Sequence, residues 1–267
     1  MKESSNLENP EARSFFLTGG KIAVVIIHGY GGSIGDYRMI GHQLQSSGYT
    51  VSGIRLAGHG LDMDSLRRTN VNAMRTTVST EVKRLIQSGY QIVLLGSSFG
   101  GVLALDYALN YPDDLIALAT VNIALSYRGW GNLQGLILRI LKMFTPDYPK
   151  KGLNPAEQEY AIKIGSALAW PISGILETSK FAKQLKPQVI NLKIPYLIMQ
   201  SQIDNIVKLS DGRKIFSSLP LSSKWLVTIP VNTHRPFRDP TANRFMADRI
   251  NEMIHRCFRY GHLAVFQ

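Results

Sequence analysis

The most constraining feature of this sequence is a turn of small residues that joins an apolar strand-like run to an apolar helix-like run. Residues 91–95 have the length and character of a buried strand, and residues 102–110 those of a helix. The turn between them, GSSFGG at residues 96–101, fits the pattern G-x-S-x-G centred on Ser98. A sharp strand-to-helix turn lifts the central side chain clear of the sheet, so we predict a nucleophilic Ser98. Ser97 is off the centre of the pattern, and the alternative is an ordinary Gly/Ser turn before a helix.

Strand-like and helix-like segments alternate along most of the chain. This alternation predicts an α/β fold, with a mostly parallel sheet and helices on both of its faces. The other predicted strands cover residues 22–27, 50–56, 118–123, 196–201 and 224–229, and the other predicted helices cover residues 37–45, 71–86, 207–217 and 241–258. In a sheet of this kind the functional site lies beyond the carboxyl ends of the strands.

Residues 124–193 interrupt the alternation. They contain no convincing strand and are punctuated by prolines, so we predict a core domain of residues 1–123 and 194–267 with a helical cap inserted at 124–193. Within the cap, apolar residues recur on one face of a helix, with Arg139 and Lys142 on other faces. We favour packing of this face on the main domain over a helix lying on a membrane surface. The face comprises Leu133, Leu136, Ile137, Ile140, Leu141 and Phe144.

Composition and charge narrow the class of protein. A chain of 267 residues that is 45% apolar can bury an ordinary globular core. Its formal charge of +11 favours anionic partners, but the basic residues are scattered and no nucleic-acid motif accompanies them, so specific nucleic-acid binding is not expected. The single Cys257 excludes an intramolecular disulfide and a cysteine-based zinc cluster. With neither a signal peptide nor a membrane-spanning run visible, the expected location is cytoplasmic.

A serine hydroxyl becomes a useful nucleophile only when a positioned base takes its proton and a carboxylate orients that base. His234 follows the last predicted strand, and Asp204 follows the strand before it, so both belong at the same sheet edge as Ser98. Two alternatives concern the acid: Asp204 could instead cap the helix that follows it, and Asp239 is a rival that is better placed to cap the last helix.

The remaining histidines have other predicted roles. His28 and His59 lie in glycine-rich turns beside the site, where we expect them to brace those turns through hydrogen bonds, although His59 could also line a pocket. The other three histidines, His42, His255 and His262, are predicted to lie on the surface.

Several motifs together resemble the α/β-hydrolase superfamily, and more narrowly its carboxylesterase and monoacylglycerol lipase-like branch with a helical cap. The resemblance spans residues 22–258 and departs from the family pattern at Thr233, where a glycine often precedes the catalytic histidine. The motifs are HGYGG at 28–32, GHG at 58–60, GSSFGG at 96–101, IDNIV at 203–207, and His234. Their order of serine, then aspartate, then histidine is characteristic of the fold.

The resemblance implies a role for each matching residue. Ser98 would be the nucleophile, His234 the general base and then the general acid, and Asp204 the group that holds the imidazole. The oxyanion hole would consist of the backbone amides of Tyr30 and Phe99. Supporting turns would be formed around His28, Gly29, Gly96 and Gly100.

The expected reaction is hydrolysis of a small acyl ester through an acyl-enzyme, without a metal or an organic cofactor. Apolar residues of the cap, namely Trp130, Phe144, Tyr148, Trp170 and Phe181, could form an acyl pocket, although most would more commonly form the core of the cap. An anionic lipid surface is a second expected partner. Hydrolysis of C–C bonds, thioesters or lactones remains an alternative with the same residues, and so does a non-catalytic binding protein of the same fold.

Overall fold

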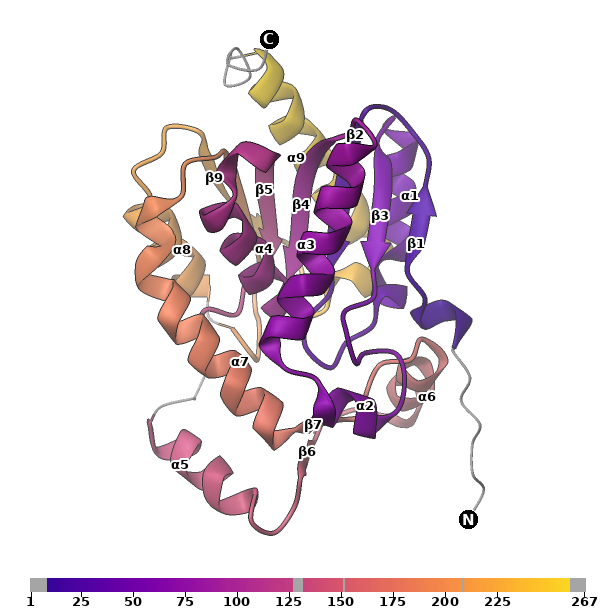
Figure 1. The fold of residues 1–267 in the computed structure, drawn as a ribbon, viewed down its shortest axis with the longest axis vertical. Helices are drawn as coiled ribbons and strands as arrows, with labels where there is room; N and C mark the ends of the chain where they lie inside the picture. The colour runs from indigo at the N-terminus through magenta and orange to yellow at the C-terminus, as the bar shows by residue number, and fades with distance from the viewer. Residues whose placement is uncertain (1–8, 127–131, 151, 208, 260–267) are drawn as a thin grey trace.

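The computed structural model describes residues 9–126, 132–150, 152–207 and 209–259. At its centre lies a seven-stranded sheet in the order β1-β3-β2-β4-β5-β8-β9 (Figure 1). Only β1 runs antiparallel to its neighbour, and all other adjacent strands are parallel, as the alternation predicted. The strands are β1 (Phe15–Leu17), β2 (Ile22–Ile27), β3 (Thr50–Ile54), β4 (Gln91–Ser97), β5 (Leu115–Val121), β8 (Tyr196–Ser201) and β9 (Lys224–Ile229).

Helices cover both faces of the sheet, and each face has its own hydrophobic cluster. Along β2, Val25 and Ile27 face one cluster while Val24 and Ile26 face the other, because side chains alternate across a strand. The first cluster includes residues of α3 (Val71–Gln87), α4 (Phe99–Asn110) and α8 (Leu209–Ser218). The second includes residues of α1 (Arg38–Ser46) and α9 (Pro240–Arg259). Figure 1 shows α3 and α4 in front of the strands and α9 behind them.

Shorter helices occupy the connections. Helix α2 (Met63–Arg68) was not predicted, because it spans less than two turns and shows no apolar periodicity. It begins where the Asp62 side chain accepts a hydrogen bond from the Ser65 amide. The 3₁₀ helices are η1 (Pro10–Ala12), η2 (Ile34–Tyr37), η3 (Pro112–Asp114), η4 (Lys186–Asn191) and η5 (Pro236–Arg238). None of the helices in the described ranges is long and apolar enough to cross a membrane.

The segment between β5 and β8 contains two strands that the sequence prediction missed. It comprises α5 (Asn132–Leu141), β6 (Asp147–Pro149), α6 (Pro155–Lys163), β7 (Ala169–Pro171) and α7 (Ile172–Leu185). The strands β6 and β7 pair antiparallel, with Tyr148 opposite Trp170. The expectation of no strand here was therefore wrong, since three-residue strands that each end in proline are too short to show an alternating pattern.

Helix α7 connects this segment to the main core. Its residues Ala182 and Leu185 belong to the cluster that includes α3 and α4, whereas Ile172 and Ile175 pack with Leu138 of α5 in a small separate cluster. The described part of the segment is thus fixed to the sheet domain through the second half of α7.

The apolar face predicted for α5 does not pack on the main domain. Leu136, Ile137, Ile140 and Phe144 are 45–81% exposed. Of the described side chains of the predicted face, only Leu141 packs inward, against the small cluster that Leu138 forms with α7. Our expectation of a packed face was wrong because the run is apolar on several sides, so periodicity alone cannot select the buried one. Trp130 and His262 and the side chain of Leu133 lie outside the described residues. Figure 1 shows α5 at the periphery, beyond α7.

Candidate active site

Three side chains predicted from the sequence meet at the carboxyl edge of the sheet. Ser98 follows β4, Asp204 follows β8 and His234 follows β9. The Nε2 atom of His234 lies 3.1 Å from Oγ of Ser98, and its Nδ1 atom lies 2.7 Å from Oδ2 of Asp204. Thr233 does not prevent this approach. The arrangement can move a proton from the serine hydroxyl to the imidazole while the carboxylate stabilises the imidazolium that forms.

The turn that carries Ser98 is strained and tightly packed. Ser98 has φ of 53° and ψ of −121°, in a region that residues with a side chain rarely adopt. A Cβ atom on Gly96 would collide with the carbonyl of Gly100, and one on Gly100 would collide with the carbonyl of Ile27. Both glycines are therefore required by close backbone approach. Helix α4 begins at Phe99, not at Val102 as predicted, which places the Phe99 amide in the first turn, at the positive end of the helix.

The carboxylate of Asp204 is held on both of its oxygens. Oδ2 accepts from Nδ1 of His234, and Oδ1 accepts from the amides of Ile206 and Val207 at 2.7 and 2.9 Å. Asp204 therefore does both things: it accepts hydrogen bonds from the loop that follows it, and it orients the imidazole of His234. The rival acid, Asp239, instead caps the last helix, as predicted: its Oδ1 accepts from the Ala242 amide in the first turn of α9.

A buried asparagine that was not predicted as a site residue positions the loop that carries His234. Asn122, just after β5, has φ of 49° and donates through Nδ2 to Ser201 Oγ and to the backbone carbonyl of His234. Its Oδ1 accepts from the Ser201 amide at 2.8 Å. The side chain therefore ties the ends of β5 and β8 to the loop after β9. The sequence prediction had placed Asn122 inside the strand at residues 118–123, and a polar side chain near the carboxyl end of that apolar run was the signal that could have identified it.

His28 and His59 brace the neighbouring turns, as predicted. Nε2 of His28 accepts from the Leu56 amide, and Nε2 of His59 accepts from the Gly31 amide at 2.9 Å. In each ring Nδ1 lies 2.9 Å from a backbone carbonyl, that of Gly29 or Ala57. Burial lowers the pKa of His28 to about 4 and that of His59 to about 3. Both rings therefore stay neutral near pH 7. His42 and His255 are exposed, as expected.

The turn after β2 lies directly against the nucleophile. A Cβ atom on Gly29 would be 3.1 Å from Cβ of Ser98, so this turn can bring the amide of Tyr30 to the reacting centre. The segment between β5 and β8 holds the turn from the other side. Nε1 of Trp170 donates to the Tyr30 carbonyl at 3.3 Å, and Nζ of Lys150 donates to the Gly31 carbonyl at 2.7 Å. The oxyanion-hole role of the Tyr30 and Phe99 amides stays a prediction.

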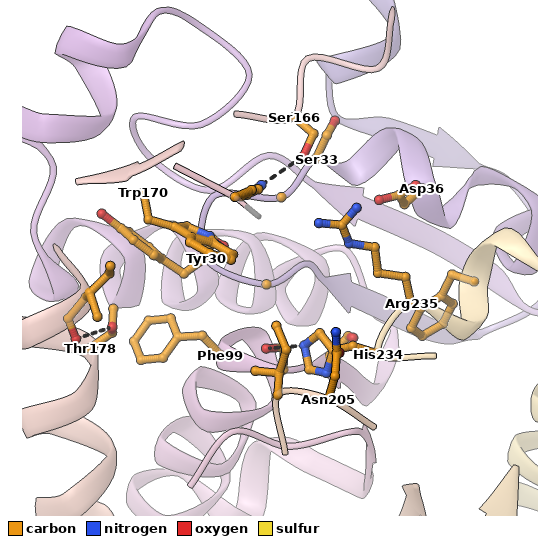
Figure 2. Close-up of a pocket in the computed structure, with 18 of the residues that line it drawn as sticks. Tyr30, Ser33, Asp36, Phe99, Ser166, Trp170, Thr178, Asn205, His234 and Arg235 are labelled. Carbon is orange, nitrogen blue, oxygen red and sulfur yellow. Dashed lines mark hydrogen bonds between the residues drawn. The ribbon is translucent and has the colours of Figure 1, made fainter. Parts of the chain in front are cut away.

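Ser98 and His234 open into a cavity of about 320 Å³ with two chemically different sides. Figure 2 shows Tyr30, Phe99 and Trp170 on one side of His234, and Asp36 and Arg235 on the other. Lys150 and Arg235 also line the cavity, although the sequence prediction assigned neither of them a role in the site. Arg235 was detectable as the neighbour of His234. Lys150 was not, because only the pairing of β6 with β7 places it.

This parallel sheet, with helices on both faces and a serine, an aspartate and a histidine after β4, β8 and β9, defines the α/β-hydrolase fold. A family model described as serine aminopeptidase, S33, matches residues 20–241, and the chain belongs to this family. It thus belongs to the superfamily that the motifs indicated.

Relatives with lipase and esterase names cover most of the chain. It is 26% identical over 230 residues to a thermostable monoacylglycerol lipase from Bacillus sp. (strain H-257), with 84% of this chain and 86% of the relative covered. It is 22% identical over 216 residues to a carboxylesterase from Bacillus subtilis (strain 168), covering 80% and 85%. The crystal structure of the monoacylglycerol lipase of Paleococcus ferrophilus superposes with a TM-score of 0.75 at 20% identity, covering 92% of this chain and 99% of that one.

Proposed function

We propose that this protein hydrolyses carboxylic esters of small acyl substrates through an acyl-enzyme on Ser98. The observation that carries the proposal is the continuous chain of contacts from Ser98 through His234 to Asp204, at the edge of a cavity large enough for a small ester. The lipase and esterase names of the relatives support the choice of an ester bond over the other bonds that this fold cleaves.

The proposed mechanism uses His234 first as a general base and then as a general acid. His234 takes the proton of Ser98 as Oγ attacks the ester carbonyl, and the amides of Tyr30 and Phe99 stabilise the negative charge on the carbonyl oxygen. A single donor of this kind is worth about 3 to 4 kcal/mol where it has been measured. His234 then gives the proton to the departing alcohol. Water, activated by His234, finally releases the acid from Ser98.

The experiment that tests this function is a substrate panel. We expect hydrolysis of 4-nitrophenyl esters of graded acyl length, with a maximum at short to medium chains because the cavity is about 320 Å³. Matched acyl thioesters and lactones, assayed in parallel, are expected to react more slowly. Cleavage of the thioesters or lactones with little hydrolysis of any open-chain ester would contradict the proposal and favour the alternative reactions.

We also propose that an anionic lipid surface is a partner of this protein, through the exposed face of α5. This face presents Leu136, Ile137 and Ile140, and the turn after it adds Met143 and Phe144, which are 80% and 81% exposed. Arg139 and Lys142 are exposed beside them. Apolar side chains interleaved with basic ones suit the boundary between the headgroups and acyl chains of an anionic bilayer.

The expected result is that the protein cosediments with phosphatidylglycerol vesicles and that Ile140→Ser weakens this binding about tenfold, since an inserted isoleucine is worth roughly 1.5 kcal/mol or more. Ile190→Ser is the matched control, because Ile190 is 53% exposed in η4 and Ile140 is 50% exposed in α5. Added salt should weaken vesicle binding without slowing hydrolysis of a small neutral ester. Equal vesicle binding by the two variants would exclude α5 as the docking surface.

A further inference from the structure

We propose that the charged side of the active-site cavity is an anion-binding subsite, formed by Lys150 and Arg235, that selects esters carrying a carboxylate or phosphate group. The inference rests on the proposed function, because it specifies which part of an ester substrate this side of the cavity receives. It concerns the substrate itself and is separate from the exposed face of α5.

The side chains that gather here have a surplus of positive charge. Lys150, Arg235 and Asp36 line the cavity, and Arg238 lies just behind them. The carboxylate of Asp36 is already engaged, since Nε and an Nη atom of Arg238 contact its two oxygens at 2.9 and 3.3 Å. The next acidic group that acts on Arg235 is Glu157, whose carboxylate accepts from the Asn154 amide at the start of α6. Asp36 is therefore paired with Arg238 and acts on Lys150 and Arg235 only at longer range, so three basic side chains share one carboxylate at this side of the cavity.

Lys150 is buried, and the groups that its Nζ atom contacts directly are neutral. Its Nζ donates to the Gly31 carbonyl at 2.7 Å and to Ser166 Oγ at 3.4 Å, and it lies 5.2 Å from the centroid of the Trp170 ring, so none of its direct contacts among the described residues is an anion. Burial and the nearby Arg235 lower the pKa of Lys150 to about 7. An anion in the cavity would reverse both effects, because it would offer an acceptor and an opposite charge.

Arg235 presents a guanidinium without an ion-pair partner within 4.0 Å in the described part of the chain. Figure 2 shows this guanidinium pointing into the cavity, on the side of Asp36 and away from the aromatic side chains. Burial, and then the charge of Arg238, lower its pKa. The five N–H donors of this guanidinium have no acceptor in the residues that the structure describes and are left to water or a ligand, and a carboxylate or phosphate matches their geometry.

The location of these cations sets how a substrate would lie. Arg235 directly follows His234 in the chain, and Lys150 contacts the turn that carries Tyr30 and Gly31. The reacting carbonyl at Ser98 is therefore flanked by the apolar side of the cavity and by these two cations. One half of the ester would lie against Phe99 and Trp170, and the other half would place its anionic group between Lys150 and Arg235.

Two matched pairs of esters test the proposal and distinguish the two halves. Monobutyl glutarate and its carboxamide analogue, butyl 4-carbamoylbutanoate, place the charge on the acyl side. The butanoyl ester of 4-hydroxybutanoate and the corresponding carboxamide place it on the alcohol side. We expect kcat/KM to favour the carboxylate about tenfold or more in one pair, as a charge-assisted contact provides. The pair that shows the preference identifies the half that reaches the subsite.

The variant Arg235→Gln should reduce that carboxylate-to-carboxamide ratio by about tenfold, and Arg235→Lys should retain part of it. Lys150→Gln should reduce the ratio as well. The matched control is Arg213→Gln, which removes the same charge from an exposed position on α8 and should leave the ratio unchanged. A ratio near one in both pairs, or a preference that survives both Arg235→Gln and Lys150→Gln, would overturn the subsite while ester hydrolysis itself still stood.

A binding measurement keeps the subsite testable apart from catalysis. In the Ser98→Ala background, calorimetry should show the preferred carboxylate ester binding about tenfold more tightly than its carboxamide, and adding Arg235→Gln should remove the difference. Equal affinity for the two esters would refute the subsite. If the wild-type protein hydrolysed none of the four esters while the carboxylate ester still bound more tightly than its carboxamide, only the proposed function would be refuted.

Discussion

Replacing Ser98 with alanine should reduce ester hydrolysis by at least about four orders of magnitude, because no other group can form the acyl-enzyme that the proposed reaction needs. The fold should tolerate the change. Ser98 makes its structural hydrogen bonds through backbone atoms, with its amide donating to the Val121 carbonyl and its carbonyl accepting from the amides of Gly101 and Ala124. The measurement is kcat on a neutral nitrophenyl ester, together with labelling by a fluorophosphonate probe.

Ser97→Ala is the matched control for this experiment. Ser97 is the neighbouring serine, and it is buried beside the Tyr37 hydroxyl, with only 3% of its surface exposed. We expect Ser97→Ala to keep activity within about tenfold of wild type and to retain probe labelling, because it loses at most one neutral hydrogen bond. Probe labelling that persisted in Ser98→Ala would show that Ser98 is not the nucleophile. Labelling absent from the wild-type protein would favour the non-catalytic alternative.

The buried centre of the sheet was the part of the fold that could be predicted best. The predicted bounds of β2, β8 and β9 are those of the structure, because each strand is a short apolar run between polar or glycine-rich turns. Strand ends also placed the candidate site. Once the parallel strands were assigned, the residues directly after them had to share one edge, and Ser98, Asp204 and His234 do so.

Predictions failed where tertiary contacts decide the outcome. The β6–β7 pair is too short for a pattern, and the orientation of α5 depends on which of its apolar edges meets α7. The charged side of the cavity was unpredictable for the same reason. Lys150 and Arg235 are 85 positions apart in the sequence, and only the folded segment between β5 and β8 brings Lys150 to the turn beside Ser98.

Asp204→Asn should lower kcat by about 10⁴-fold without unfolding the protein. The carboxamide oxygen can still accept from the amides of Ile206 and Val207, so the loop after β8 should keep its structure. The NH₂ group would then face Nδ1 of His234, where a carboxylate oxygen now accepts. Because two donors cannot pair, Nδ1 would become an acceptor and the ring proton would move to Nε2. That nitrogen could no longer take the proton of Ser98, and a tautomer change of this kind costs about 10⁴ in a serine protease.

The control must remove the same charge from an aspartate whose carboxylate caps a helix and does not hydrogen-bond to the imidazole. Asp239→Asn does so, because Oδ1 of Asp239 accepts from the Ala242 amide at 2.8 Å and an asparagine oxygen can replace it. We therefore expect Asp239→Asn to change kcat by less than about threefold, since it leaves the His234 tautomer untouched. If Asp204→Asn kept activity within tenfold of wild type, or if Asp239→Asn showed the larger loss, the acid that orients His234 would have to be reassigned. Steady-state kcat on a neutral nitrophenyl ester, measured for both variants beside the wild-type protein, decides between these outcomes.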